Sequence, residues 1–418
     1  MSELPAPRSL RDRRTLGVLI GCFVCQMGLG CGYVFSVTLK HVVADFEWSR
    51  AAYAAGGIPL LLAMGVSAPL LGALSERIGT RTVVSVSVLL LATSLGLLSR
   101  METLLEFYLA SALLGLGMTG VGDVVVGSLA ARWVVRGRAL ALGFVFVGSN
   151  VGGAAVPPLA EAVAAQDSWR AAFEGVGLAA LVILLPFALF ALREPPAPVA
   201  LPDGGAEPDA LGEDSLDLGE ALRTRSFWIL ALALLAFYFY YLGVNQHLVA
   251  FVSDLGYSDA RAAASLGFAI FLGIFAKLAM GALADRIASR TALLANFGIL
   301  TLGACVLLGV GRPPLLLLFL MLHGLAVAAE NVVLPVVVAD CFGVRHLAKI
   351  YGALMITLFP GGALGPVFAG AVYDRLGSYQ LAFAIFAGLL ALATGGLAFV
   401  RREARVRPRA LDPVAVPE

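Results

Sequence analysis

Long apolar runs dominate this chain and leave it few possible folds. We count twelve, and each is close to the roughly 20 residues that a helix needs to cross a bilayer. They lie at 15–39, 52–74, 82–100, 104–131, 138–164, 170–193, 226–252, 261–284, 291–311, 314–338, 348–373 and 379–401. The chain is 60% hydrophobic and 14% charged, whereas soluble proteins average about 45–50% and about 25%. The sequence therefore predicts an all-α membrane protein with twelve transmembrane helices, since barrel strands would alternate and run only about 10 residues.

The basic residues predict how these helices are oriented. Most lysines and arginines fall in segments on the same side as the two ends of the chain, including Arg8, Arg11, Arg13 and Arg14. Cytoplasmic segments carry such an excess. We therefore expect both termini to be cytoplasmic and the protein to lie in the plasma (inner) membrane. The first run shows no cleavage site at its end, so we expect it to be retained. The net charge of +1 gives no indication of nucleic-acid binding.

The second half of the sequence repeats the first. The charged turn with Gly72, Glu76, Arg77 and Arg81 recurs at one offset as Gly281, Asp285, Arg286 and Arg290. Such a duplication predicts two parallel six-helix bundles, 15–193 and 226–401, with a substrate site between them. Segment 194–225, rich in Pro, Gly and acidic residues, is predicted to be a flexible cytoplasmic linker with a short surface helix near Leu216–Leu222. We expect 1–14 and 402–418 to be cytoplasmic tails.

The repeated turn has two possible roles. Its charges can pair across the seam between the bundles or meet a helix terminus. It then forms a latch that holds the outward-open state until the bundles rock. Alternatively, the turn is a topology signal with an ordinary surface salt bridge. The duplication favours the latch.

The turn also resembles the signature of the major facilitator superfamily. Three further stretches are similar to the monocarboxylate transporter and oxalate:formate antiporter group: Arg132–Gly143 leading into Gly148–Gly153, Phe227-Trp228, and Ala369–Tyr379. This resemblance covers the chain except its termini and linker. It implies a secondary transporter that works by alternating access and needs no cofactor or metal.

Lys277 lies in the middle of the apolar run 261–284. A charge at that depth costs roughly 2.5–3.5 kcal/mol, so it usually faces a bundle interior and has a function. Gly273 and Gly281 lie one turn away on the same face and leave room for a ligand. The related transporters carry a substrate-binding arginine in an Ala-Arg-x-x-Met-Gly context, and Ala276–Gly281 matches it with lysine. The resemblance implies that Lys277 binds a carboxylate. The alternative is a structural ion pair with Asp123 or Glu330.

Other polar residues in the runs are candidates for the same site. The family's aspartate one turn before the basic residue is Gly273 here, so proton coupling would fall to another group. Asp123, Glu330 and His247 are the titratable candidates, because buried carboxyl and imidazole groups can carry a proton. The candidate pocket wall consists of Tyr33, Asn150, Tyr238, Tyr241, Asn245 and Tyr351. For any one tyrosine, packing or an interfacial position is an equal alternative.

These residues favour a transporter of a small organic anion. A single buried cation suits a monocarboxylate such as lactate or pyruvate, moved by proton symport or exchange. The oxalate antiporters use a second basic residue where this chain has Ile356, Thr357 and Phe359. A proton-coupled exporter of drugs or amphipathic solutes is the alternative, and a non-transporting sensor lacks an extra domain. The sequence shows no nucleophile–base pair or metal cluster, so we do not expect an enzyme. The expected partners are the anion, protons and lipid, and we expect a working monomer.

Overall fold

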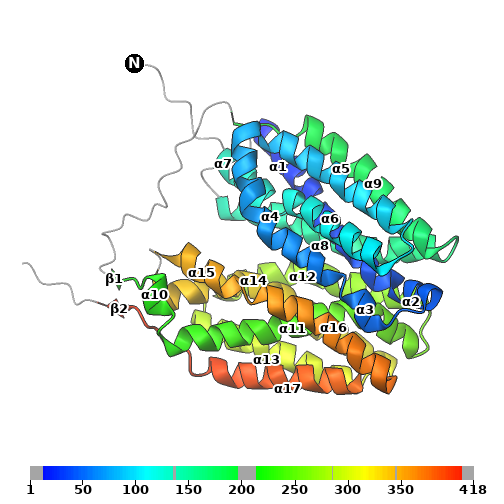
Figure 1. Ribbon diagram of the computed structural model, residues 1–418. Helices are drawn as coiled ribbons and strands as arrows, with labels where there is room; N and C mark the ends of the chain where they lie inside the picture. Colours follow the sequence, from blue (N-terminus) through cyan, green and yellow to red (C-terminus); the bar gives the residue numbers. More distant parts are fainter. Residues whose placement is uncertain (1–12, 135–137, 196–212, 285, 344–345, 407–418) are drawn as a thin grey trace, which may run out of the picture.

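The computed structural model describes residues 13–134, 138–195, 213–284, 286–343 and 346–406. Two helical bundles lie side by side (Figure 1). The first consists of α1 (Arg13–Gln26), the 3-10 helix η1 (Met27–Tyr33), α2 (Val34–Phe46), α3 (Arg50–Ala54), α4 (Gly57–Ile78), α5 (Thr80–Leu98), α6 (Leu104–Val121), α7 (Asp123–Trp133), α8 (Arg138–Ala164) and α9 (Trp169–Phe190). The second consists of α11 (Arg225–Asp254), α12 (Asp259–Ala284), α13 (Ser289–Leu308), α14 (Pro313–Phe342), α15 (Leu347–Met355), α16 (Leu358–Leu376) and α17 (Gln380–Leu397).

The predicted helical membrane fold is confirmed. In the described part of the chain, 12 segments are long and apolar enough to cross a membrane, and they coincide with the predicted runs. Several spans begin at a residue whose side chain accepts a hydrogen bond from the first helical turn. Ser49, Thr103, Ser168 and Thr224 cap α3, α6, α9 and α11 in this way. Such caps satisfy backbone N–H groups that have no partner inside the helix.

The first and fourth spans of the first bundle are broken where their counterparts are continuous, whereas the second bundle is broken in its fifth span, between α15 and α16. The first span changes from α1 to η1 and back to α2, and the fourth breaks at Gly122 between α6 and α7. Gly122 has an extended backbone (φ −83°, ψ −175°), which makes Asp123 the first residue of α7. The corresponding spans of the second bundle, α11 and α14, each run for 30 residues without a break. The apolar pattern predicted none of these breaks.

Glycines bring the first span against α8. A Cβ added to Gly152 would lie 2.1 Å from the carbonyl oxygen of Met27, and one on Gly148 would lie 2.2 Å from that of Phe23. Both distances are far below van der Waals contact. Small residues at these positions therefore let the two backbones touch, as they do in other membrane helix pairs.

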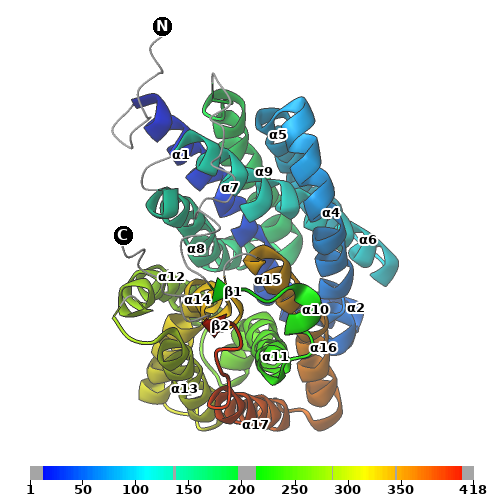
Figure 2. The ribbon, with the colours of Figure 1, turned by 90° about the vertical axis from the view of Figure 1, so that its left-hand side faces the viewer.

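The described end of the linker is docked on the second bundle (Figure 2). The two-residue strand β1 (Glu213–Asp214) pairs antiparallel with β2 (Arg405–Val406) from the C-terminal segment. The backbone N–H of Leu216 donates to the carbonyl of Phe342 at 2.9 Å. The short helix expected near 216–222 is present as α10 (Leu218–Ala221). The part of the predicted linker from residue 213 to 224 thus contains the expected short helix and is held on the second bundle by backbone hydrogen bonds.

The two bundles meet at the end of the molecule away from the described chain ends. There α3 packs on α16 and α2 on α11, and nearer the middle α8 packs on α12. Figure 1 shows α3 beside α16 at one end and α7 far from α15 at the other. Hydrogen bonds between described residues of the two bundles come from η1, α2, α3 and the middle of α8. The structure is therefore closed at the end opposite the chain ends.

Candidate functional site

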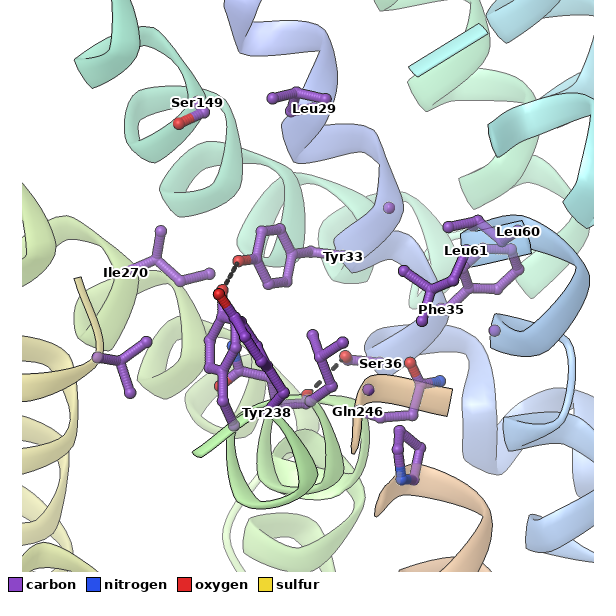
Figure 3. A pocket seen from close by; sticks show the side chains of 18 of the residues that line it. Leu29, Tyr33, Phe35, Ser36, Leu60, Leu61, Ser149, Tyr238, Gln246 and Ile270 are labelled. Carbon is purple, nitrogen blue, oxygen red and sulfur yellow. Dashed lines mark hydrogen bonds between the residues drawn. The ribbon is translucent and has the colours of Figure 1, made fainter. Parts of the chain in front are cut away.

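A cavity of about 370 Å³ lies between the bundles near the middle of the helices. Residues of both bundles line it, and Figure 3 shows Tyr33, Ser36, Tyr238, Gln246 and Ile270 around it. Six of the predicted pocket residues line it: Lys277, Tyr33, Asn150, Tyr238, Tyr241 and Asn245. The seventh, Tyr351 on α15, is not among the lining residues. Most of the predicted pocket residues thus line one cavity, and they form a part of its wall.

Lys277 is held by a neutral partner. Its Nζ donates to the side-chain oxygen of Asn150 at 2.6 Å, and the Asn150 amide nitrogen donates to the carbonyl of Ile270 at 3.1 Å. Among the described residues, none of the ion pairs includes Lys277. The structural ion pair considered from the sequence is thus not formed in this state, although the charge of Asp123 acts on Lys277 from a distance. The ammonium therefore keeps its positive charge available to the cavity.

Gly273 is required by this arrangement. A Cβ at this position would lie 2.6 Å from the amide nitrogen of Asn150 and 2.8 Å from the Cβ of Ala328. An aspartate one turn before the lysine would displace Asn150. Where the related transporters carry an aspartate, this chain therefore has Gly273, and the space is filled by the amide of Asn150 from the opposite bundle.

The three titratable candidates lie in different surroundings, and none of them is a lining residue of the cavity. Asp123 accepts a hydrogen bond from the amide of Gln26, beside the breaks in the first and fourth spans. Glu330 on α14 is fully buried, and neither carboxyl oxygen has a hydrogen-bond partner among the described residues. His247 bonds at both ring nitrogens, to the hydroxyl of Tyr379 at 2.9 Å and the carbonyl of Pro366 at 2.8 Å.

Two tyrosine hydroxyls connect the bundles across the cavity wall. The hydroxyls of Tyr33 and Tyr241 are 3.1 Å apart, and the Ser36 hydroxyl donates to the backbone carbonyl of Asn245 at 2.7 Å (Figure 3). The cavity thus has a cation on one side and hydroxyl and amide groups on another.

Sequence reasoning missed His323, although it lines the cavity. Its Nε2 is 2.9 Å from the side-chain oxygen of Asn245, and its Nδ1 is 2.7 Å from the hydroxyl of Tyr240. The available signal was its position seven residues before Glu330, which places the two residues on one face of a helix. Ser36, Gln246 and Asn331 line the cavity too and were also missed.

Sequence reasoning also missed the group that closes one end. One Arg50 guanidinium nitrogen lies 2.8 Å from Asp254 and 2.6 Å from the Tyr379 hydroxyl, and the guanidinium stacks 3.6 Å from the ring centre of Tyr373. The backbone N–H groups of Arg50 and Ala51 donate to the two Asp374 oxygens at 2.8 and 2.9 Å. We call Arg50, Asp254, Tyr373, Asp374 and Tyr379 the Arg50 clamp. The stretch Ala369–Tyr379, noted for its resemblance, supplies three of its members.

The described contacts of the repeated charged turns stay within one bundle each. Arg81 donates to the carbonyl of Leu192 at 3.0 Å, and Arg290 donates to that of Ala398, each within its own bundle. Glu76, Arg77 and Arg286 are exposed, Gly72 lies in α4 and Gly281 in α12. Asp285 lies outside the described residues. The latch remains a prediction for the opposite state.

Two similar six-helix bundles around a cavity that is closed at one end define a secondary transporter. The family model of the Major Facilitator Superfamily matches residues 18–311 and, in a second match, 274–415. The chain belongs to this superfamily, and it is an integral multi-pass membrane protein, not an enzyme.

Named relatives agree with the expected subgroup. Monocarboxylate transporter 13 of Bos taurus is 27% identical over 388 residues, which cover 91% of this chain and 87% of the relative. Monocarboxylate transporter 11 of Homo sapiens is 29% identical, with 87% of this chain and 78% of the relative covered. An uncharacterised transporter of the superfamily from Escherichia coli, YhjX, is 26% identical, with 81% and 83% covered.

Solved structures show the same fold. A bacterial homologue of the human lysosomal transporter Spinster, in an inward-facing and occupied conformation, superposes with a TM-score of 0.73 at 16% identity, covering 92% of this chain and 96% of that chain. The nucleoside transporter NupG superposes with a TM-score of 0.72 at 15% identity, covering 92% and 98%.

Proposed function

We propose that this protein transports a monocarboxylate such as lactate or pyruvate across the plasma (inner) membrane, as a monomer, by proton symport. One observation supports the substrate above the others: the ammonium of Lys277 lies at the cavity, and its bonded partner in the described part of the chain is the neutral Asn150. A carboxylate can take up that charge by a charge-assisted hydrogen bond. The relatives named monocarboxylate transporters support the same substrate class.

The state described here is then inward-facing. With both termini cytoplasmic, the Arg50 clamp lies on the outer side and the open end faces the cytoplasm. In the outward-facing state the clamp opens and the repeated charged turns close the inner end. The Arg50 clamp thus stabilises the inward-facing state, and the repeated charged turns stabilise the outward-facing state.

Glu330 is the proton carrier in this proposal. An isolated ionised carboxylate is very costly to bury, whereas a protonated carboxyl group is much less so. Glu330 is fully buried without a hydrogen-bond partner in the described part of the chain, and it acts electrostatically on Tyr238 and Tyr241 of the cavity wall. It therefore lies behind the cavity, where a proton can be taken up and released as the helices move. Asp123 already has Gln26 as a partner, and His247 has both ring nitrogens bonded.

Uptake into proteoliposomes tests the proposal. With labelled L-lactate outside and an inward proton gradient, we expect accumulation that collapses when a protonophore removes the gradient. Accumulation only when unlabelled lactate is preloaded inside would replace symport by exchange. No lactate or pyruvate movement under either condition would contradict the proposed substrate class.

Replacement of Glu330 by glutamine is expected to separate coupling from binding. The amide has nearly the shape of a protonated carboxyl group but cannot release a proton. We expect uptake driven by the proton gradient to fall at least about tenfold, while exchange of labelled for unlabelled lactate persists. Asp123→Asn is the matched variant. If it uncouples transport and Glu330→Gln does not, the proton is carried by Asp123.

A further inference from the structure

A chain of buried hydrogen bonds leads from α11 through α14 to the cavity. The Tyr240 hydroxyl lies 2.7 Å from Nδ1 of His323, and Nε2 of His323 lies 2.9 Å from the side-chain oxygen of Asn245. Tyr240, His323 and Asn245 are 0%, 2% and 5% exposed. The Asn245 side chain lies near enough to the Tyr33 and Tyr241 hydroxyls to act on both, and all three residues line the cavity.

The direction of this chain follows from its first member. In the described part of the protein, the Tyr240 hydroxyl has one hydrogen-bond partner, Nδ1 of His323. A buried hydroxyl proton without an acceptor costs about 1–3 kcal/mol. A hydroxyl that donates its proton avoids this cost, even when its oxygen accepts no hydrogen bond. Tyr240 therefore donates to Nδ1. The imidazole proton must then be on Nε2, from which it is donated to the Asn245 oxygen.

The same assignment of donors and acceptors determines which polar groups face the cavity. Because the Asn245 oxygen accepts from His323, its NH₂ group points toward the Tyr33–Tyr241 pair. Within that pair, 3.1 Å apart, one hydroxyl donates to the other. The remaining hydroxyl proton then has no acceptor inside the pair. It is free to donate to a ligand in the cavity that both tyrosines line.

We infer that His323, as its neutral Nε2–H tautomer, is a positioning residue that makes this wall of the cavity a hydrogen-bond donor and so selects a carboxylate over a neutral or cationic solute. The inference rests on the proposed anion transport. A reversed chain, with the proton on Nδ1, would present the Asn245 oxygen to the tyrosines and leave an acceptor-rich wall. Lys277 supplies the charge, and His323 sets the polarity of the groups opposite.

The tautomer can be measured without any substrate. The chain has four histidines, so ¹⁵N-histidine NMR of the purified protein should resolve them, and the signal lost in His323→Gln identifies His323. We expect a protonated Nε2 and an unprotonated Nδ1. In Tyr240→Phe we expect the Nε2–H tautomer to persist, because a proton on Nδ1 would then be buried without an acceptor. A protonated Nδ1 or a charged ring in the wild type would overturn the inference.

Transport measurements on His323 variants distinguish a positioning role from a purely structural one. In His323→Leu we expect the KM for L-lactate to rise about tenfold, with a smaller change in maximal rate and in binding of uncharged lactamide. His323→Gln should recover most of the affinity, since its carbonyl can accept from Tyr240 and its NH₂ can donate to Asn245. Equal behaviour of the Leu and Gln variants would contradict the inference. If the wild type moves no lactate but keeps the Nε2–H tautomer, the proposed function fails and the hydrogen-bond chain stands.

Discussion

Replacing Lys277 by methionine is expected to lower the affinity for L-lactate about 10- to 150-fold. The ammonium is the charge that the cavity offers to an anion, and its bonded partner Asn150 cannot replace it. A charge-assisted hydrogen bond contributes about 1.5–3 kcal/mol, and 1.4 kcal/mol is a factor of ten in affinity. Isothermal titration and proteoliposome uptake would measure the loss. Lys277→Arg, which keeps the charge, should retain binding.

The thermal stability of the same variants distinguishes a binding role from a structural one. Lys277 has no ion-pair partner among the described residues, so methionine should leave the Tm unchanged or raise it. A fall in Tm with lactate uptake intact would instead make the lysine structural. Lys349→Met is the matched control, because Lys349 is exposed on α15 and should affect neither property.

Replacing Arg50 by alanine is expected to shift the protein toward its outward-open state. The substitution removes the bonds to Asp254 and Tyr379 and the stacking on Tyr373, all of which join the two bundles. Charge-assisted bonds and cation–π contacts at partly buried sites together amount to about 2–3 kcal/mol, which changes the ratio of states roughly 30- to 150-fold. Asp254 keeps Lys40 at 3.0 Å, so no isolated buried charge results.

Spin labels on the outer ends of the bundles would report this shift. Gln166 and Arg312 are exposed and lie in outer connections of the first and second bundle. Electron–electron resonance should show a longer distance between them in Arg50→Ala. Arg170→Ala is the matched control, because Arg170 bonds to the carbonyls of Ser99 and Met101 and stacks on Trp169 within one bundle. Equal distances in the Arg50 variant and the wild type would show that the clamp does not set the equilibrium.

Much of the fold was predictable because transmembrane helices must be long and apolar. The duplicated turn and the span boundaries followed from that pattern alone. The breaks at η1 and Gly122 were not predictable, since glycine occurs in both continuous and interrupted membrane helices. The docking of β1 on β2 depends on backbone pairing between distant segments, which hydropathy does not report.

The site was predictable only where a single residue was unusual for its surroundings, such as a charge within an apolar run. Lys277 was such a residue, and the cavity confirms its position at the interface. His323 was missed because a lone histidine in an apolar run usually packs in the core. Arg50 was missed because it resembles any basic residue at a helix end. Its partners Asp254 and Asp374 belong to the other bundle, and contacts between bundles leave no periodic trace in the sequence.

The interrupted spans of the first bundle have a mechanical consequence. Two of its central helices change direction at η1 and Gly122, beside the Gln26–Asp123 bond, whereas α11 and α14 are unbroken rods of 30 residues. Interruptions of this kind lower local stiffness, because the backbone bonds that would resist bending are missing. The second bundle is interrupted elsewhere, between α15 and α16, where the first bundle has the continuous α8. The two bundles therefore bend at different spans, and the first bundle yields to its cargo at its first and fourth spans.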